Sequence, residues 1–142
     1  MSTNRNVRPI VNEGQPQFHA DALSLDLGPQ EIHRAVHAIP VGDDDEQLTE
    51  IAISGSAGQD GVLMRLNHPI RITMEGPLGD YAFAYNAESD IRMTGDVGSG
   101  VAEGMVSGAV RVRGNAGVGA GTGMTGGTLA IYGDAGNRCG AA

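Results

Sequence analysis

Residues 90–108 read DIRMTGDVGSGVAEGMVSG, residues 109–127 read AVRVRGNAGVGAGTGMTGG, and the two stretches align without a gap. Each begins with a short alternating segment, continues into a Gly-x-x-Gly motif and ends in a glycine-rich run. A third copy, TLAIYGDAGNRCGAA, begins at Thr128. Self-similarity at a fixed period is the sequence signature of a repeat protein. The repeat therefore decides the fold, and the rest of the chain is interpreted around it.

A Gly-x-x-Gly motif follows the alternating segment in each of five copies, and after a slightly longer first step these copies are evenly spaced. Glycine accepts positive φ angles and lets neighbouring backbones approach closely. We therefore predict that the motif glycines form the structural turns of the repeat. These glycines are Gly55, Gly58, Gly76, Gly79, Gly95, Gly98, Gly114, Gly117, Gly133 and Gly136.

Before each motif the residues alternate between apolar and mixed or polar side chains, which is typical of a short β-strand with one buried face. The apolar positions are Ile51 and Ile53, Ile72 and Met74, Ile91 and Met93, Val110 and Val112, and Leu129 and Ile131. A 19-residue unit is too short for a strand with a crossover helix, which needs about 30 residues. The sequence predicts an all-β fold, a right-handed parallel β-helix of ~19-residue coils with equivalent strands about 4.8 Å apart.

The first part of the chain, residues 1–48, differs in kind from the repeats of residues 49–142. After an extended arm, residues 22–27 alternate like a strand, and a helix is expected to begin at Gly28-Pro29 and to end at Pro40. Its apolar face consists of Ile32, Ala35, Val36 and Ile39. An acidic loop, residues 43–46, follows. We expect this region to cap the first coil. Ala142 falls in mid-coil, so a longer chain or another polypeptide is expected to continue the stack.

Composition limits the functional classes. The 142 residues carry a formal net charge of −8 and include nine arginines and no lysine, which disfavours a nucleic-acid partner. No apolar run approaches the roughly 20 residues of a membrane helix, and no secretory leader is apparent. We therefore expect a cytoplasmic protein. The single cysteine, Cys139, aligns with Ala82, Val101 and Ala120, which predicts a buried, inert thiol.

No residue of the sequence is predicted to be catalytic, cofactor-binding or metal-binding. The run from Val118 to Gly123 resembles a dinucleotide-binding loop, but such a loop opens a helix, whereas here another alternating segment follows. It is interpreted as a structural turn. His33 and His37 stand four residues apart on the expected helix, a spacing compatible with metal binding, and are interpreted as part of a polar helix face because no third ligand is evident.

A second ladder of polar residues follows the first glycine of three successive motifs. Its members are Asp96, Asn115 and Asp134. Some calcium-binding β-helices use such ladders, but with a nine-residue period. We expect these side chains to support tight turns through hydrogen bonds to nearby backbone.

Three arginines, Arg92, Arg111 and Arg113, form the one local concentration of positive charge in the repeats. Stacked like charges repel one another, so a carboxylate is expected to face them, either a local one such as Asp90 or one on a partner. We predict that this face docks another subunit.

The quoted coils resemble the glycine-repeat (GXGXG) β-helix domain at the C-terminal end of glutamate synthase large subunits. The lead-in LDLGPQEIHRAVHAI, residues 25–39, resembles the stand-alone version of that domain, which is similar to the middle one of the three subunits of N-methylglutamate synthase. The resemblance spans about residues 20–142. One subunit of formylmethanofuran dehydrogenase carries a related repeat.

The resemblance implies a non-catalytic scaffold subunit of a glutamate-synthase-like amidotransferase and oxidoreductase complex. It implies two partners, a synthase subunit that carries FMN and an iron–sulfur cluster, and an amidotransferase-like subunit. It transfers no catalytic residue to this chain. The alternative is an independent β-helix protein that binds or processes carbohydrate, which would need a groove rich in carboxylates or aromatics.

Overall fold

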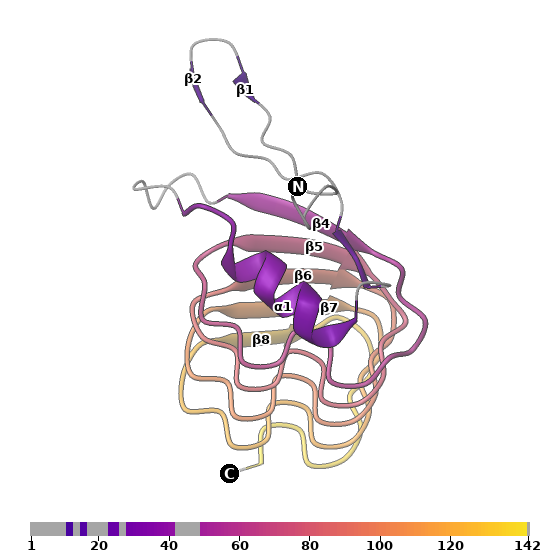
Figure 1. Cartoon of the computed structure of the whole chain (residues 1–142). Helices are drawn as coiled ribbons and strands as arrows, with labels where there is room; N and C mark the ends of the chain where they lie inside the picture. Colours follow the sequence, from indigo (N-terminus) through magenta and orange to yellow (C-terminus); the bar gives the residue numbers. More distant parts are fainter. Residues whose placement is uncertain (1–10, 13–14, 17–22, 26–27, 42–48, 142) are drawn as a thin grey trace.

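The fold is a parallel β-solenoid of about four turns with coils of about 19 residues, as the repeat predicts. The computed structural model describes residues 11–12, 15–16, 23–25, 28–41 and 49–141. Six parallel strands form one sheet in chain order, from β3 to β8, and each coil returns through loops to the start of the next strand (Figure 1). The repeat strands are β4 (Glu50–Ser54), β5 (Arg71–Glu75), β6 (Asp90–Thr94), β7 (Ala109–Arg113) and β8 (Thr128–Ile131).

The register of the sheet follows the sequence repeat. Val110 pairs with Ile91 on one side and with Leu129 on the other, so each strand is displaced from the next by one full repeat. Glu50 pairs with Arg71, so the longer first step of the sequence is preserved in the register as well. Equivalent positions of successive coils therefore lie side by side, and the predicted ladders are confirmed.

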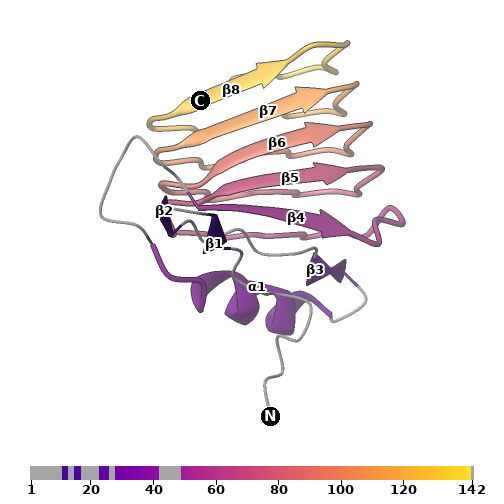
Figure 2. The ribbon, with the colours of Figure 1, turned by 90° about the horizontal axis from the view of Figure 1, so that it is seen from above.

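The interior of the solenoid is filled by the predicted apolar ladders. Ile72, Ile91 and Val110 are each 0% exposed, because a coil lies on either side of them. Leu129 and Ile131 of β8 are only half-buried and pack against the core. Strand β8 is the last strand of the stack (Figure 2). The apolar pattern is therefore the same in every coil, while burial falls at the last one.

The prediction of a buried Cys139 is wrong, because Cys139 is exposed. Its counterparts Ala82, Val101 and Ala120 are each 0% exposed, and each lies between two described coils. Cys139 belongs to the last described coil, which has a described neighbour on one side only. The alignment of the repeats identifies its place in the ladder but not this difference in surroundings.

Two features account for the glycines of the repeat. Some motif glycines adopt positive φ, for example Gly95 at 125°. Others, such as Gly117, lie so close to the preceding coil that an added Cβ would stand 2.9 Å from the carbonyl carbon of Gly98. The backbone N–H of Gly117 donates to the Gly98 carbonyl oxygen at 3.0 Å. At positions such as Gly117, glycine is needed for close packing between coils rather than for its φ angle.

Helix α1 (Pro29–His37) begins directly after Gly28, as predicted. Its apolar residues Ile32 and Val36 are buried and join the same core cluster as the coils. Strand β3 (Leu23–Ser24) pairs with β4 and is shorter than the predicted strand, of which residues 22, 26 and 27 lie outside the described residues. Figure 2 shows α1 beside the β4 end of the stack, opposite β8.

The start of the chain contains a small antiparallel pair, β1 (Val11–Asn12) with β2 (Gln15–Pro16), where the sequence predicts an extended arm. The predicted acidic loop, residues 43–46, lies outside the described residues. Over the part of the chain that the structure describes, no helix has the length and apolarity needed to cross a membrane.

Candidate functional site

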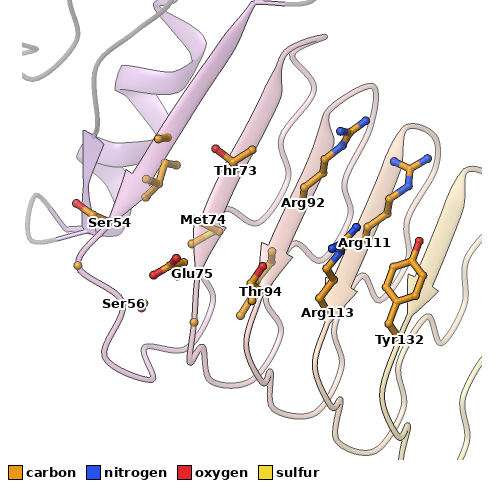
Figure 3. A pocket seen from close by; sticks show the side chains of 15 residues that line it. Ser54, Ser56, Thr73, Met74, Glu75, Arg92, Thr94, Arg111, Arg113 and Tyr132 are labelled. Carbon is orange, nitrogen blue, oxygen red and sulfur yellow. The ribbon is translucent and has the colours of Figure 1, made fainter.

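The candidate site is a groove of about 840 Å³ on the outer face of the sheet, lined by residues of β4 to β7, by the turns after β4 and β5, and by Tyr132 directly after β8. Successive residues of a strand point to opposite faces, so the residues between the buried ladders point into this groove. Figure 3 shows the side chains of Arg92, Arg111, Arg113 and Tyr132 on this one face. The structure thus brings together the three arginines that the sequence predicts as a docking surface.

Asp90, at the start of β6, forms ion pairs with three arginine side chains. Its carboxylate accepts hydrogen bonds from Arg71 and from Arg111, each at 3.1 Å, and Arg92 approaches it to 3.7 Å. The expectation that a local carboxylate faces the stacked arginines is confirmed. Because the Asp90 side chain is only 16% exposed, these charge-assisted bonds are less screened than fully exposed pairs.

Arg71 extends the network toward the first coil. It donates to Glu50 at 2.8 Å as well as to Asp90. The hydrogen bond to Glu50 is the main reason that the pKa of Arg71 lies above its ordinary value; burial opposes this rise, and the bond to Asp90 adds to it. Arg71 therefore stays charged wherever its two carboxylates are ionised, and it links β4, β5 and β6 electrostatically.

Arg113, at the end of β7, differs from the other arginines of the groove. Among the described residues it forms no ion pair with a carboxylate, and its guanidinium lies 5.8 Å from the centre of the Tyr132 ring. That distance is compatible with a cation–π interaction. Arg113 is exposed, so it retains donors for a group outside this chain.

Tyr132 was not predicted as part of the site, although the sequence holds the signal. It follows Arg113 by one full repeat, and the ladder therefore places it beside Arg113 in the outward column. Glu75, which also lines the groove, lies in the same column two coils before Arg113. Extending the ladder to the outward positions finds both residues.

The side chains of Asp96 and Asn115 do accept hydrogen bonds from turn backbone, as predicted, but that backbone belongs to the next coil. The Asp96 side chain accepts from the backbone N–H of Asn115 at 2.8 Å, and that of Asn115 accepts from the N–H of Asp134 at 2.8 Å. Asp80 does the same for the N–H of Ser99. The equivalent turns lie close enough for each side chain to reach the next coil, which sequence reasoning about isolated turns overlooks.

The glycine run from Val118 to Gly123 is a turn of the solenoid. Gly119, Gly121 and Gly123 have φ angles of 76°, 68° and 71°. Equivalent positions of earlier coils are also left-handed, including Tyr81 at 60°. Strand β8 follows this run, as the interpretation of a structural turn requires, whereas a dinucleotide-binding loop would lead into a helix.

Histidines join α1 to the first coil. His37 contacts the side chain of Asn67 at 2.7 Å, and Nε2 of His68 lies 2.6 Å from the carbonyl oxygen of Ile39. The rings of His33 and His37 lie 4.2 Å apart. No group of three or more His, Cys, Asp or Glu side chains within the described ranges could hold a metal ion. His68 is distant in sequence from the helix, so no pattern in the chain points to it.

Comparison with known proteins finds no matching protein-family model, no match among curated proteins and no match among solved structures. The function is therefore inferred from the solenoid, its groove and the residues themselves.

Proposed function

We propose that this chain is a non-catalytic scaffold subunit of a glutamate-synthase-like amidotransferase and oxidoreductase complex, of the N-methylglutamate synthase type. The proposal combines the sequence resemblance of the glycine coils with the character of the fold. A solenoid packs each coil only on its neighbours and forms an extended, stiff body. Such a body can hold two partner subunits at a fixed separation.

The observation that carries the proposal is the glycine-built coil. Its corners are packed backbone on backbone, for example at Gly98 and Gly117, where a side chain would not fit. The groove on the strand face offers charge and hydroxyl groups but is open to solvent, whereas catalytic sites are typically enclosed and mostly apolar. These features support docking in preference to chemistry.

In this proposal the partners are a synthase subunit with FMN and an iron–sulfur cluster and an amidotransferase-like subunit, and the complex is cytoplasmic. This chain supplies no cofactor ligands. Its one cysteine, Cys139, could provide at most one of the thiolates that an iron–sulfur cluster requires. The cofactor chemistry is therefore assigned to the partners.

The carbohydrate alternative has less support. Glycoside hydrolysis generally uses two carboxyl groups on either side of the scissile bond. The groove is lined by one carboxylate, Glu75, and one aromatic residue, Tyr132, among the described residues. We therefore do not propose it.

The test is affinity purification of the tagged full-length chain from its native cells under low-salt conditions. The proposal predicts co-elution, in fixed stoichiometry, of a subunit with flavin absorbance and of an amidotransferase-like subunit identified by mass spectrometry. The chain alone should show neither flavin absorbance nor glutaminase activity. Elution as a single species that binds a glycan array would contradict the proposal.

A further inference from the structure

We propose that the groove over β4 to β8 binds an extended acidic segment of a partner polypeptide, with Arg113 as its principal contact. This inference deepens the proposed function, because it assigns the docking face of the scaffold and the chemistry of what docks there. It rests on that function for the identity of the partner, but the binding itself can be measured independently.

The arginines of the groove differ in how far they are already paired. Arg111 and Arg92 are oriented by Asp90 but remain 37% and 48% exposed, respectively. A guanidinium has five N–H donors, so each keeps donors for a second carboxylate. Arg113 has no carboxylate partner among the described residues, and Tyr132 lies beside it. Within the described part of the chain, the groove therefore holds one free cation and two partly used ones.

These cations belong to an otherwise acidic molecule. The chain as a whole carries a net charge of −8, so it repels acidic polypeptides in general. The arginines of β6 and β7 reverse this locally, and electrostatic complementarity of this kind selects partners and orients them. An acidic segment would bind at these arginines and be repelled by the acidic remainder of the surface.

The groove is long and open. It extends across five strands, from residues of β4 to Tyr132 directly after β8. Four steps of about 4.8 Å give about 19 Å, the length of roughly six extended residues. A small anion would fill little of this groove and would stay largely hydrated. A polypeptide can contact the whole length, through carboxylates at the arginines and through backbone groups at the hydroxyls of Ser54 and Thr73, which also line it.

Glu75 gives the groove a direction. It lies on the β5 side of the groove and repels a carboxylate there, while the arginines attract carboxylates on the β6 and β7 side. The acidic residues of the bound segment are therefore expected over β6 and β7. Removing the charge of Glu75 should strengthen binding, which is an outcome that misfolding of a variant would not produce.

The experiment measures fluorescence anisotropy of a labelled synthetic peptide in which glutamate alternates with glycine, titrated with the full-length chain at low salt. Binding is expected to weaken at least tenfold from about 50 to about 500 mM NaCl, because exposed charges are screened. We expect Arg113→Ala to weaken binding about tenfold and Arg113→Lys to restore part of it. The combined variant Arg111→Glu with Arg113→Glu should abolish it.

Two further variants guard against non-specific effects. Arg138→Gly removes the same charge at an exposed, left-handed position where two earlier coils have glycine, and it should bind the peptide as the parent does. Glu75→Gln should bind about threefold more tightly. A glutamine–glycine peptide, which lacks the carboxylates, should not bind.

Equal binding by the parent and by the Arg113→Ala and Arg111→Glu with Arg113→Glu variants would overturn the proposal. So would absence of peptide binding at about 1 mM, or binding of a single-stranded oligonucleotide but not the peptide through the same arginines. Co-elution of the two partner subunits with the Arg111→Glu with Arg113→Glu variant would refute this docking face but leave the scaffold function standing. Peptide binding by the parent without any co-eluting partner subunit would support this docking face but contradict the scaffold function.

Discussion

Replacing Gly117 with alanine tests the packing of the solenoid most directly. The added Cβ would lie 2.9 Å from the carbonyl carbon of Gly98 and 2.9 Å from the backbone nitrogen of Ser99. Ordinary Cβ contacts lie at 3.4–4 Å, so the two coils must separate by about half an ångström at this corner. The hydrogen bond from Gly117 to the Gly98 carbonyl, 3.0 Å long, lies in the same place and would be stretched.

The matched control is Gly123→Ala. Gly123 has a φ angle of 71°, but nothing lies within 4 Å of an added Cβ. Gly123→Ala should therefore lower the free energy of unfolding through backbone strain alone, by about 1 kcal/mol. Overpacking at Gly117 is expected to cost about 2–3 kcal/mol. Both changes reduce the entropy of the unfolded chain equally, so this contribution cancels when the two free energies of unfolding are compared. A larger loss for Gly117→Ala than the strain cost of Gly123→Ala then reports the contact between coils.

Urea denaturation followed by circular dichroism gives the two free energies of unfolding. At about 3 °C per kcal/mol for a chain of this size, the melting temperature of Gly117→Ala should fall by about 6–9 °C and that of Gly123→Ala by about 3 °C. If Gly117→Ala were as stable as Gly123→Ala, the corner would not be packed backbone on backbone, and close packing would no longer explain the motif glycines.

Three other substitutions test the polar contacts. Asp90→Asn should lower the free energy of unfolding by about 1–2 kcal/mol at low salt, and by less in about 500 mM NaCl, because it leaves stacked arginines without their shared carboxylate; urea denaturation at two salt concentrations checks this. Asn86→Asp should cost about 3 kcal/mol at neutral pH, because the fully buried Asn86 amide donates to the carbonyls of Ser89 and Ser107, which would repel a carboxylate. Since protonation of that acid favours the folded state, the variant should regain stability as the pH is lowered, measured by thermal melts from about pH 7 to about pH 5. Asn115→Ala should cost about 0.5–1 kcal/mol by removing one bond between coils, checked by the same urea assay.

The sequence was sufficient for those features that repeat every coil. Inward ladders such as Ile91, Val110 and Leu129 follow from period-two alternation combined with the constant step of the repeat, and the sheet register confirms them. Helix α1 was predicted equally well, because Pro29 and the apolar spacing after it are local signals. In both cases the information lies within one coil or one helix turn.

What the sequence did not predict depends on where a coil lies in the stack or on contacts between distant segments. Cys139 occupies the same ladder as the buried Ala120 yet is exposed, because burial requires a coil on both sides. The bond from Asn115 to the N–H of Asp134 and the approach of His68 to Ile39 depend on how turns and helix are arranged in space. Reasoning about one turn at a time cannot supply them.

The repeat also indicates where a function can reside in this chain. Inward positions are restricted by packing, and corners are restricted by contact between backbones, so the outward strand positions are the ones free to vary. There the coils do differ, with Thr73 in β5 followed by Arg92 and Arg111 in the same column of β6 and β7.

Stacking two arginines is unfavourable for the sheet itself, and here it requires Asp90 as a shared counter-charge. The fold must compensate the repulsion between Arg92 and Arg111, and the other described coils have no such pair. We therefore explain the pair by a role in binding and not by a role in folding. The acidic partner segment that we propose would bind to this pair. The groove over β4 to β8, with its arginines on β6 and β7, is therefore the place to look for the docking face that we propose.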